Sequence, residues 1–135
     1  MSVQTTLCYV DDGSAYLMLH RVKKEHDVNK GKWIGIGGKF EADESPEECM
    51  MREVREETGL TPHVWRYRGI VTFVSGRWVT EYMHLFTITG WTGAVRSCNE
   101  GILEWVPKDE LLDLPHWKGD EVFLKLIADP EQPFF

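Results

Sequence analysis

The sequence lacks the features that are typical of a membrane-spanning or secreted protein. No apolar run in its 135 residues approaches the roughly 20 residues that a transmembrane helix needs. The first residues, MSVQTT, contain neither the charged nor the apolar region of a signal peptide. Cysteine is scarce, and Cys8, Cys49 and Cys98 are widely spaced and form no CxxC pair. These absences favour a reducing compartment, so we expect a cytoplasmic protein.

Basic residues are outnumbered by acidic ones. The chain has 15 Lys and Arg residues and 22 Asp and Glu residues, which gives a net charge of −7. Such a chain is not expected to bind nucleic-acid polymers or anionic membranes in general. The five histidines are scattered and form no HExxH pair, which argues against a zinc site. An acidic protein that acts on a phosphorylated substrate therefore needs a metal ion and a local group of basic residues.

The order of patterns along the chain predicts one domain of residues 1–135 with a mixed sheet and helices against it. There is no internal repeat, low-complexity tract or linker. Residues rich in β-branched and aromatic side chains predict strands at 5–10, 15–20, 64–74, 78–88 and 102–106. Amphipathic patterns predict a helix after Ser45, a short helix at 108–114 after Pro107 and a last helix at 120–128, with a loop at 90–99. The fold class is α/β (α+β by some schemes), with α/β/α layers.

Residues 38–60, GKFEADESPEECMMREVREETGL, are the most informative stretch. Ser45 is a good N-cap, with Pro46 and Glu48 completing the start signal, and Gly59 is a suitable stop. On an ideal helix Glu53, Glu56 and Glu57 fall within an arc of roughly 100°. The three like charges lie near the helix C-terminus, where the macrodipole disfavours anions. The arc is either a solvated acidic face or a site for a hard cation such as Mg²⁺.

The same stretch resembles a complete Nudix box. Gly38 is followed after five residues by Glu44 and after seven more by Arg52-Glu53-Val54; Glu56-Glu57 and Gly59-Leu60 close the pattern. The resemblance implies a Nudix fold and a hydrolase that cleaves a nucleoside diphosphate linked to a further group. It also implies metal ligation by Glu53, Glu56 and Glu57, with Mg²⁺ as cofactor and Mn²⁺ as the alternative. Any of the clustered carboxylates is a candidate for the general base.

Three further residues are expected to complete this catalytic cluster. Arg52 lies between the acidic residues and is expected to orient them. The carbonyl of Gly38, at the end of the glycine-rich segment 33–38, is a candidate backbone ligand of the metal. Glu100 precedes an aromatic strand and resembles by position the downstream glutamate that related enzymes use as a ligand or base. From its residue type alone, Glu100 is equally a surface acid at a strand entrance.

Basic residues near the glycine-rich segment are candidates for substrate binding. The segment 21–32 contains five of them, and Arg21 ends an apolar strand, so we expect it to bind phosphate better than its neighbours. Lys39 follows the glycines and is a second candidate. The segment is not a Walker A motif, because Lys39 precedes Phe40 rather than Ser or Thr. The alternative is a solvated loop.

Beyond the box, the chain resembles the oxidised-purine nucleoside triphosphatases of the Nudix family. In that subfamily a Trp stacks on the base and neighbouring acids read the purine edge; Trp117 and Asp120 stand at the matching positions. Two residues depart from the pattern, because Ile34 replaces an Asn and Gly119 replaces a second acid. The alternative for Trp117 is core packing.

The resemblance implies a Mg²⁺-dependent enzyme that converts a nucleoside triphosphate of the 8-oxo-dGTP type to monophosphate and pyrophosphate, and so cleanses the nucleotide pool. The expected partner is the nucleotide substrate, with no nucleic-acid polymer, membrane or obligate protein partner implied. Two alternatives are a Nudix hydrolase of another substrate, such as a dinucleoside polyphosphate or nucleotide sugar, and a non-catalytic nucleotide-binding module. The chain has no hallmark of the NADH, coenzyme A or ADP-ribose branches.

Overall fold

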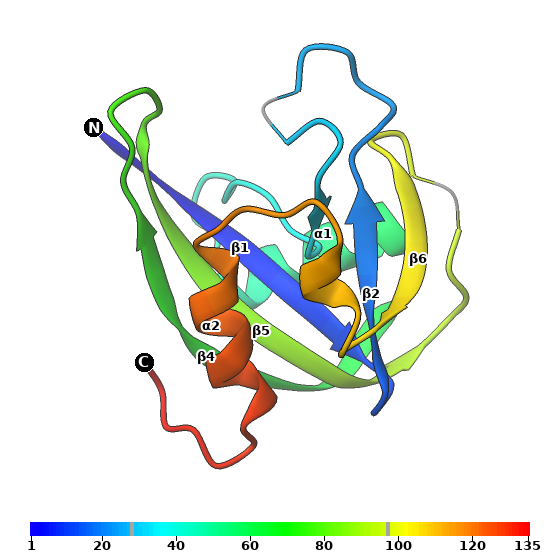
Figure 1. The fold of residues 1–135 in the computed structure, drawn as a ribbon. Helices are drawn as coiled ribbons and strands as arrows, with labels where there is room; N and C mark the ends of the chain where they lie inside the picture. The colour runs from blue at the N-terminus through cyan, green and yellow to red at the C-terminus, as the bar shows by residue number, and fades with distance from the viewer. Residues whose placement is uncertain (28, 97) are drawn as a thin grey trace.

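The computed structural model describes residues 1–27, 29–96 and 98–135, so Val28 of the basic segment and Ser97 of the expected 90–99 loop lie outside the described residues. The elements in chain order are β1 (Ser2–Asp11), β2 (Ala15–His20), β3 (Trp33–Ile34), α1 (Pro46–Thr58), β4 (Thr61–Phe73), β5 (Thr80–Thr92), β6 (Ile102–Pro107), the 3₁₀ helix η1 (Leu111–Asp113) and α2 (Asp120–Ala128). Figure 1 shows the sheet between the two α-helices, with α2 in front and α1 behind.

The six strands form one mixed sheet. Its order is β3-β2-β1-β5-β4, and β6 pairs with the strand β2. β1 and β5 run parallel, whereas the other strand pairs are antiparallel. The glycine-rich segment lies between β1 and β2, because Trp33 pairs with β2 while Ile36 and Lys39 form bridges to β1. This position brings the glycines to the middle of the sheet.

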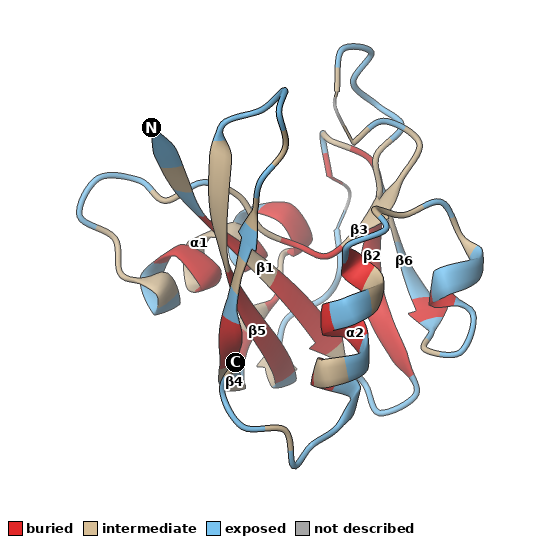
Figure 2. Ribbon diagram, turned by 60° about the vertical axis from the view of Figure 1, so that its left-hand side comes forward, coloured by how far each residue is buried: buried red, intermediate tan, exposed pale blue. Residues whose placement is uncertain are grey.

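Two apolar clusters fill the space on the two faces of the sheet. Met50 and Val54 of α1 pack on one face, and Phe123 and Ile127 of α2 pack on the other (Figure 2). The predicted α/β/α layers with a mixed sheet are confirmed. Met51, the neighbour of Met50 on the same helix, is half-exposed and belongs to neither cluster.

The ends of α1 follow from local sequence. The side chain of Ser45 accepts a hydrogen bond from the Glu48 N–H, and the Glu48 carboxylate accepts one from the Ser45 N–H, as in a capping box. Gly59 ends the helix with φ of 84°, a left-handed conformation that glycine adopts without strain. The predicted start and stop of this helix are confirmed.

Several predicted bounds are wrong. The long hairpin strands extend to Thr61 and Thr92, so residues 90–92 belong to β5 rather than to the expected loop. Residues at these strand ends carry no local pattern that predicts a strand. They are held in the sheet by cross-strand pairing, such as that of Pro62 with Trp91. The expected helix at 108–114 is reduced to the single 3₁₀ turn of η1. α2 was predicted with its observed bounds. No helix in the described residues is both long and apolar enough to cross a membrane.

A buried arginine fixes α2 on the sheet. Arg68 of β4 donates hydrogen bonds to the carbonyls of Ile127 and Asp129, at 3.0 and 2.9 Å. A cation at the last carbonyls of a helix stabilises it in two ways: it donates hydrogen bonds to them, and its charge is attracted to the negative end of the helix macrodipole. Arg68 thereby holds the helix whose first turn carries Asp120.

Candidate active site

The carboxylates of the acidic helix are organised by one arginine. The Nε and Nη2 atoms of Arg52 donate to Glu44 at 2.6 and 2.9 Å, and Nη1 donates to Glu53 at 2.9 Å and to Glu56 at 3.3 Å. Nε also lies 3.0 Å from a carboxylate oxygen of Glu41. The hydrogen bond from Arg52 lowers the pKa of Glu44 to about 2. Arg52 therefore contacts three of these carboxylates through hydrogen bonds.

Glu57 is the most deeply buried of these acids. One of its oxygens accepts a hydrogen bond from the N–H of Gly37 at 2.9 Å, which ties α1 to the glycine-rich segment. Burial, a hydrogen bond with the side chain of Glu100 and the nearby charges of Glu100 and Glu53 raise the pKa of Glu57 to about 10. The hydrogen bond from Glu57 lowers the pKa of Glu100. The proton of this pair is therefore on Glu57, and Glu100 is the charged partner.

Glu53 lies directly against Gly38. A Cβ placed on Gly38 would be 2.7 Å from one oxygen of Glu53, so only glycine leaves room for this carboxylate. Burial raises the pKa of Glu53. The carbonyl of Gly38 accepts a hydrogen bond from the Thr6 N–H at 2.9 Å and a weaker one from the Cys49 thiol at 3.7 Å, so a metal bound to this oxygen would have to displace the thiol.

Glu56 is not gathered with the other predicted ligands. Its side chain is 60% exposed and its contact is the ion pair with Arg52. Within residues 1–27, 29–96 and 98–135, no three acidic, histidine or cysteine side chains are already arranged to hold an ion. The chemistry of the donors nevertheless fits a hard cation, because they are carboxylates, and burial together with the nearby Glu100 and Glu53 raises the pKa of Glu57. A dication there would replace the proton.

The basic segment reaches the site through Glu100. Arg21 forms an ion pair with Asp27 at 2.6 Å and a longer one with Glu100 at 3.5 Å, and Lys24 lies 3.4 Å from Glu100. Lys23 donates to the carbonyl of Cys98 at 2.6 Å. Arg21 therefore lies at the site as predicted, but its guanidinium is held by two acids.

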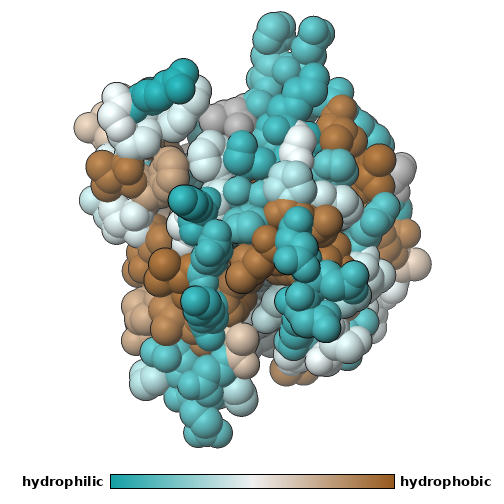
Figure 3. Space-filling model, in the orientation of Figure 1, coloured by the Kyte–Doolittle hydropathy of each residue, from teal (hydrophilic) through white to brown (hydrophobic). Residues whose placement is uncertain are grey.

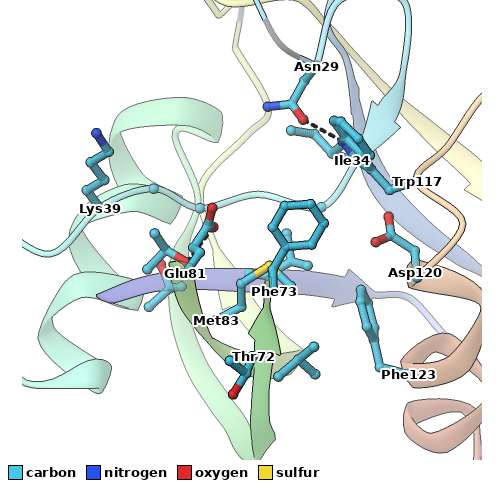
Figure 4. A pocket seen from close by; sticks show the side chains of 18 of the residues that line it. Asn29, Ile34, Lys39, Thr72, Phe73, Glu81, Met83, Trp117, Asp120 and Phe123 are labelled. Atoms are coloured by element: carbon cyan, nitrogen blue, oxygen red, sulfur yellow. Dashed lines mark hydrogen bonds between the residues drawn. The ribbon is translucent and has the colours of Figure 1, made fainter. Parts of the chain in front are cut away.

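A cavity of about 470 Å³ opens next to the acidic cluster (Figure 4). All five residues predicted to bind substrate line it: Arg21, Ile34, Lys39, Trp117 and Asp120. Gly37 and Gly38 line it as well, and these glycines contact Glu57 and Glu53 on their other side. Figure 3 shows that hydrophobic surface is exposed among polar side chains on this face of the molecule.

Trp117 lies in the cavity wall and belongs to neither apolar core cluster. Its Nε1 donates to the side chain of Asn29 at 2.6 Å, its ring meets that of Phe73 edge-on with centroids 5.9 Å apart, and the Lys32 ammonium lies 4.4 Å from its centroid. These contacts fix the plane of the indole. Beside it, burial raises the pKa of Asp120 to about 6.

Sequence reasoning missed the cavity residues that come from the sheet. Val71 and Phe73 of β4 and Glu81 and Met83 of β5 line the cavity. Their alternation along each strand was readable, but the face that turns toward the cavity depends on strand pairing. No local signal distinguishes it.

Comparison with known proteins agrees with this geometry. The NUDIX domain model matches residues 1–127. The CTP pyrophosphohydrolase of Escherichia coli (strain K12) is 32% identical over 103 residues, covering 73% of this chain and 75% of that protein. The oxidized purine nucleoside triphosphate hydrolase of Danio rerio is 28% identical over 110 residues, covering 81% and 70%.

A solved structure matches nearly the whole chain. The MutT protein from Bacillus halodurans superposes with a TM-score of 0.82 at 33% identity, covering 98% of this chain and 86% of that one. The predicted fold and the predicted family are both confirmed. The chain belongs to the NUDIX family and is a hydrolase that acts on phosphoric anhydride bonds.

Proposed function

We propose that the protein is a Mg²⁺-dependent pyrophosphohydrolase of nucleoside triphosphates. Water adds to the substrate, the anhydride bond between the α- and β-phosphates breaks, and the products are a nucleoside monophosphate and pyrophosphate. The observation that carries the proposal is the position of Gly37 and Gly38. These two residues line the 470 Å³ cavity and at the same time contact the carboxylates of Glu57 and Glu53. A nucleotide in the cavity would thus place its phosphates beside the acidic cluster.

The carboxylates supply the ligands for the ion. Glu53, Glu56, Glu57 and Glu100, with the carbonyl of Gly38, would hold Mg²⁺, or Mn²⁺ in its place. A bound ion neutralises charge on the phosphate oxygens and orients the anhydride bond. Arg52 orients Glu53 and would release Glu56 toward the site. A carboxylate of this cluster that is free of the ion takes the proton from the attacking water.

The cavity would receive the nucleoside. Trp117 offers an aromatic face for base stacking, which is worth about 1–3 kcal/mol per base and does not by itself distinguish bases. Asp120 lies beside it and, with its raised pKa of about 6, can share a proton with a base edge. Lys39 and Arg21 line the cavity and would face the phosphates.

Oxidised purine nucleotides of the 8-oxo-dGTP type are the proposed preferred substrates. The proposal is supported by the presence of Trp117 and Asp120 in the cavity wall and by the similarity to the fish enzyme of that name. The role would be cleansing of the nucleotide pool in the cytoplasm. Ile34 lines the cavity where that subfamily has an amide, so the base is read by the remaining polar groups.

A screen for pyrophosphate release tests the proposal. The protein is incubated with Mg²⁺ and with ordinary and oxidised nucleoside triphosphates, CTP, dinucleoside polyphosphates and nucleotide sugars. We expect pyrophosphate from triphosphates, with 8-oxo-dGTP giving the highest kcat/KM. Faster cleavage of dinucleoside polyphosphates or nucleotide sugars would replace the proposed substrate class. Binding without turnover on any of them would identify a nucleotide-binding module instead.

A further inference from the structure

A second carboxylate lies in the substrate cavity, and neither the Nudix box nor the resemblance to the triphosphatases assigns it a role. Glu81 lies near the start of β5, opposite Val3 of β1 and Phe73 of β4. Its Oε2 accepts a hydrogen bond from the hydroxyl of Thr5 at 2.8 Å. Figure 4 shows the Glu81 side chain pointing into the cavity, with Phe73 beside it and Trp117 and Asp120 farther along the wall.

The surroundings of Glu81 place it at the part of the cavity that receives an uncharged group. Val71 and Phe73 of the neighbouring strand β4 and Met83 of its own strand β5 line the cavity. Among the residues that the structure describes, no Lys, Arg or His side chain forms a salt bridge with Glu81 or Asp120. Carboxylates without a basic partner repel phosphate groups. The nucleobase, rather than the triphosphate, is therefore the part of the substrate that can lie against them.

The hydrogen bond from Thr5 determines which base atoms Glu81 can recognise. An ionised carboxylate only accepts hydrogen bonds, and Thr5 gives its single proton to Oε2. The remaining lone pairs of Glu81 can accept only N–H groups. Guanine and its oxidised forms carry a ring N–H next to an exocyclic amino group, which matches a carboxylate in a bidentate way. Thymine and uracil carry one N–H between two carbonyls, and a carboxylate oxygen repels those carbonyls.

We propose that Glu81 is a specificity-determining residue of this enzyme. Its carboxylate, oriented by Thr5, selects nucleobases that present adjacent N–H donors, guanine and its oxidised forms above all, and rejects thymine and uracil. The assignment rests on the proposed function, since it concerns the nucleotide that enters the same cavity. It also explains how an edge can be read where Ile34 and Gly119 offer no polar side chain.

Two variants and one control test this role. Glu81→Gln keeps the size of the side chain but adds donors, and Thr5→Val keeps the carboxylate but removes the hydrogen bond that orients it. Glu104→Gln is the matched control, because Glu104 is an exposed acid on β6 that does not line the cavity. The readouts are kcat/KM for dGTP and dTTP with Mg²⁺, and the Kd of dGMP and dTMP by calorimetry. Thermal unfolding of each variant reports on folding.

For Glu81→Gln we expect the ratio of kcat/KM for dGTP to that for dTTP to fall at least tenfold, and the ratio of monophosphate affinities to fall in the same direction. Thr5→Val should shift both ratios less, and Glu104→Gln should shift neither. If Glu81→Gln folds and leaves both ratios unchanged, the assignment is overturned while the hydrolase function stands. A change confined to the preference between GTP and dGTP would overturn it too, because Glu81 would then read the sugar. If no triphosphate is cleaved but dGMP binding still depends on Glu81, the hydrolase proposal fails and the assignment stands.

Discussion

The side chains of Glu57 and Glu100 form a pair in which Glu57 carries the proton and Glu100 the charge. Glu57 comes from the buried face of α1 and Glu100 from the segment before β6, and a hydrogen bond joins them. The pKa of Glu57 is raised to about 10 and that of Glu100 is lowered. Arg21 and Lys24 balance the charge of Glu100, at 3.5 and 3.4 Å, but among the described residues no basic side chain forms a salt bridge with Glu57. Ionisation of Glu57 would therefore require a further cation beside the pair.

Binding of Mg²⁺ should release a proton. Because the pKa of Glu57 is about 10, its carboxyl is protonated between pH 7 and pH 9 in the metal-free protein, and the ion must displace this proton. The apparent Kd for Mg²⁺ should therefore fall by up to about tenfold per pH unit in this window. Calorimetry in buffers of different ionisation enthalpy measures the protons released. A pH-independent Kd with no proton release would show that Glu57 is not a ligand.

Replacing Glu57 with Gln should abolish most activity and stabilise the metal-free fold. The amide loses a metal ligand, which should lower kcat by about 10²-fold or more. It also removes the like-charge contact with Glu53 and Glu100, so the Tm without metal should rise, most clearly at alkaline pH. Glu47→Gln is the control, because Glu47 is an exposed acid in the first turn of the same helix. Near-normal turnover of the Glu57 variant would remove the proposed metal site.

Replacing Gly38 with Ala should disturb the cluster from outside the helix. The added Cβ would lie 2.7 Å from a carboxylate oxygen of Glu53, so the carboxylate or the glycine segment must shift. We expect kcat/KM to fall about tenfold or more, because small displacements of catalytic groups have large effects on rate. Gly76→Ala is the matched control, since a Cβ there meets no atom within 4 Å. Equal kinetics of the two variants would mean that Glu53 has no required position.

Replacing Arg52 with Lys should keep the charge but lose the organisation of the acids. The guanidinium donates to Glu44, Glu53 and Glu56 together, and an ammonium does not match that fork geometry. Activity should fall by about tenfold or more, with a lower Tm. Because the pKa of Glu44 is depressed to about 2, its contribution to stability is present above pH 4.5 and is lost as the pH falls toward 2. The free energy of unfolding of the variant, measured in urea, should therefore fall less between pH 5 and pH 3 than that of the wild type.

The sequence predicted the bounds of the acidic helix, whereas it missed the cavity residues that come from the sheet, and the reason is physical. Ser45, Glu48 and Gly59 mark the ends of α1 through contacts within a few residues, so their roles are readable locally. The box spacing likewise fixes the helical arc. In contrast, Glu81 faces the cavity only because β5 pairs with β1 and β4 in one register, and a shift of one residue would turn it to the other face.

The exposure of Glu56 shows the same limit from another side. The helical arc places Glu56 with Glu53 and Glu57, but its side chain turns to Arg52 and to solvent. The direction of a side chain within a helical arc depends on the group that it pairs with. For Glu56 this group is the guanidinium of Arg52.

The last prediction concerns Asp120 and follows from its pKa of about 6. Since burial raises this pKa from the ordinary value of 3.8, the folded state binds more protons than the unfolded state between about pH 4 and pH 6. The charge on Asp120 therefore lowers the free energy of unfolding as the pH rises through this window. Asp120→Asn removes that effect. Its stability relative to the wild type should increase between pH 4 and pH 7 by about 1–2 kcal/mol, less than the about 3 kcal/mol of the full shift because the side chain keeps some solvent.

Urea unfolding at pH 4 and pH 7 measures the difference, with Asp109→Asn as an exposed control. The charge of His116 lowers the pKa of Asp120, so the His116→Ala background should enlarge the effect. The same titration has a functional consequence. Near pH 6 the carboxyl can donate a proton to an acceptor on the base, whereas above it the carboxylate only accepts. The KM for oxidised purine nucleotides should therefore depend on pH around 6 in the wild type and not in Asp120→Asn; an identical pH profile of KM in both proteins would remove Asp120 from base recognition.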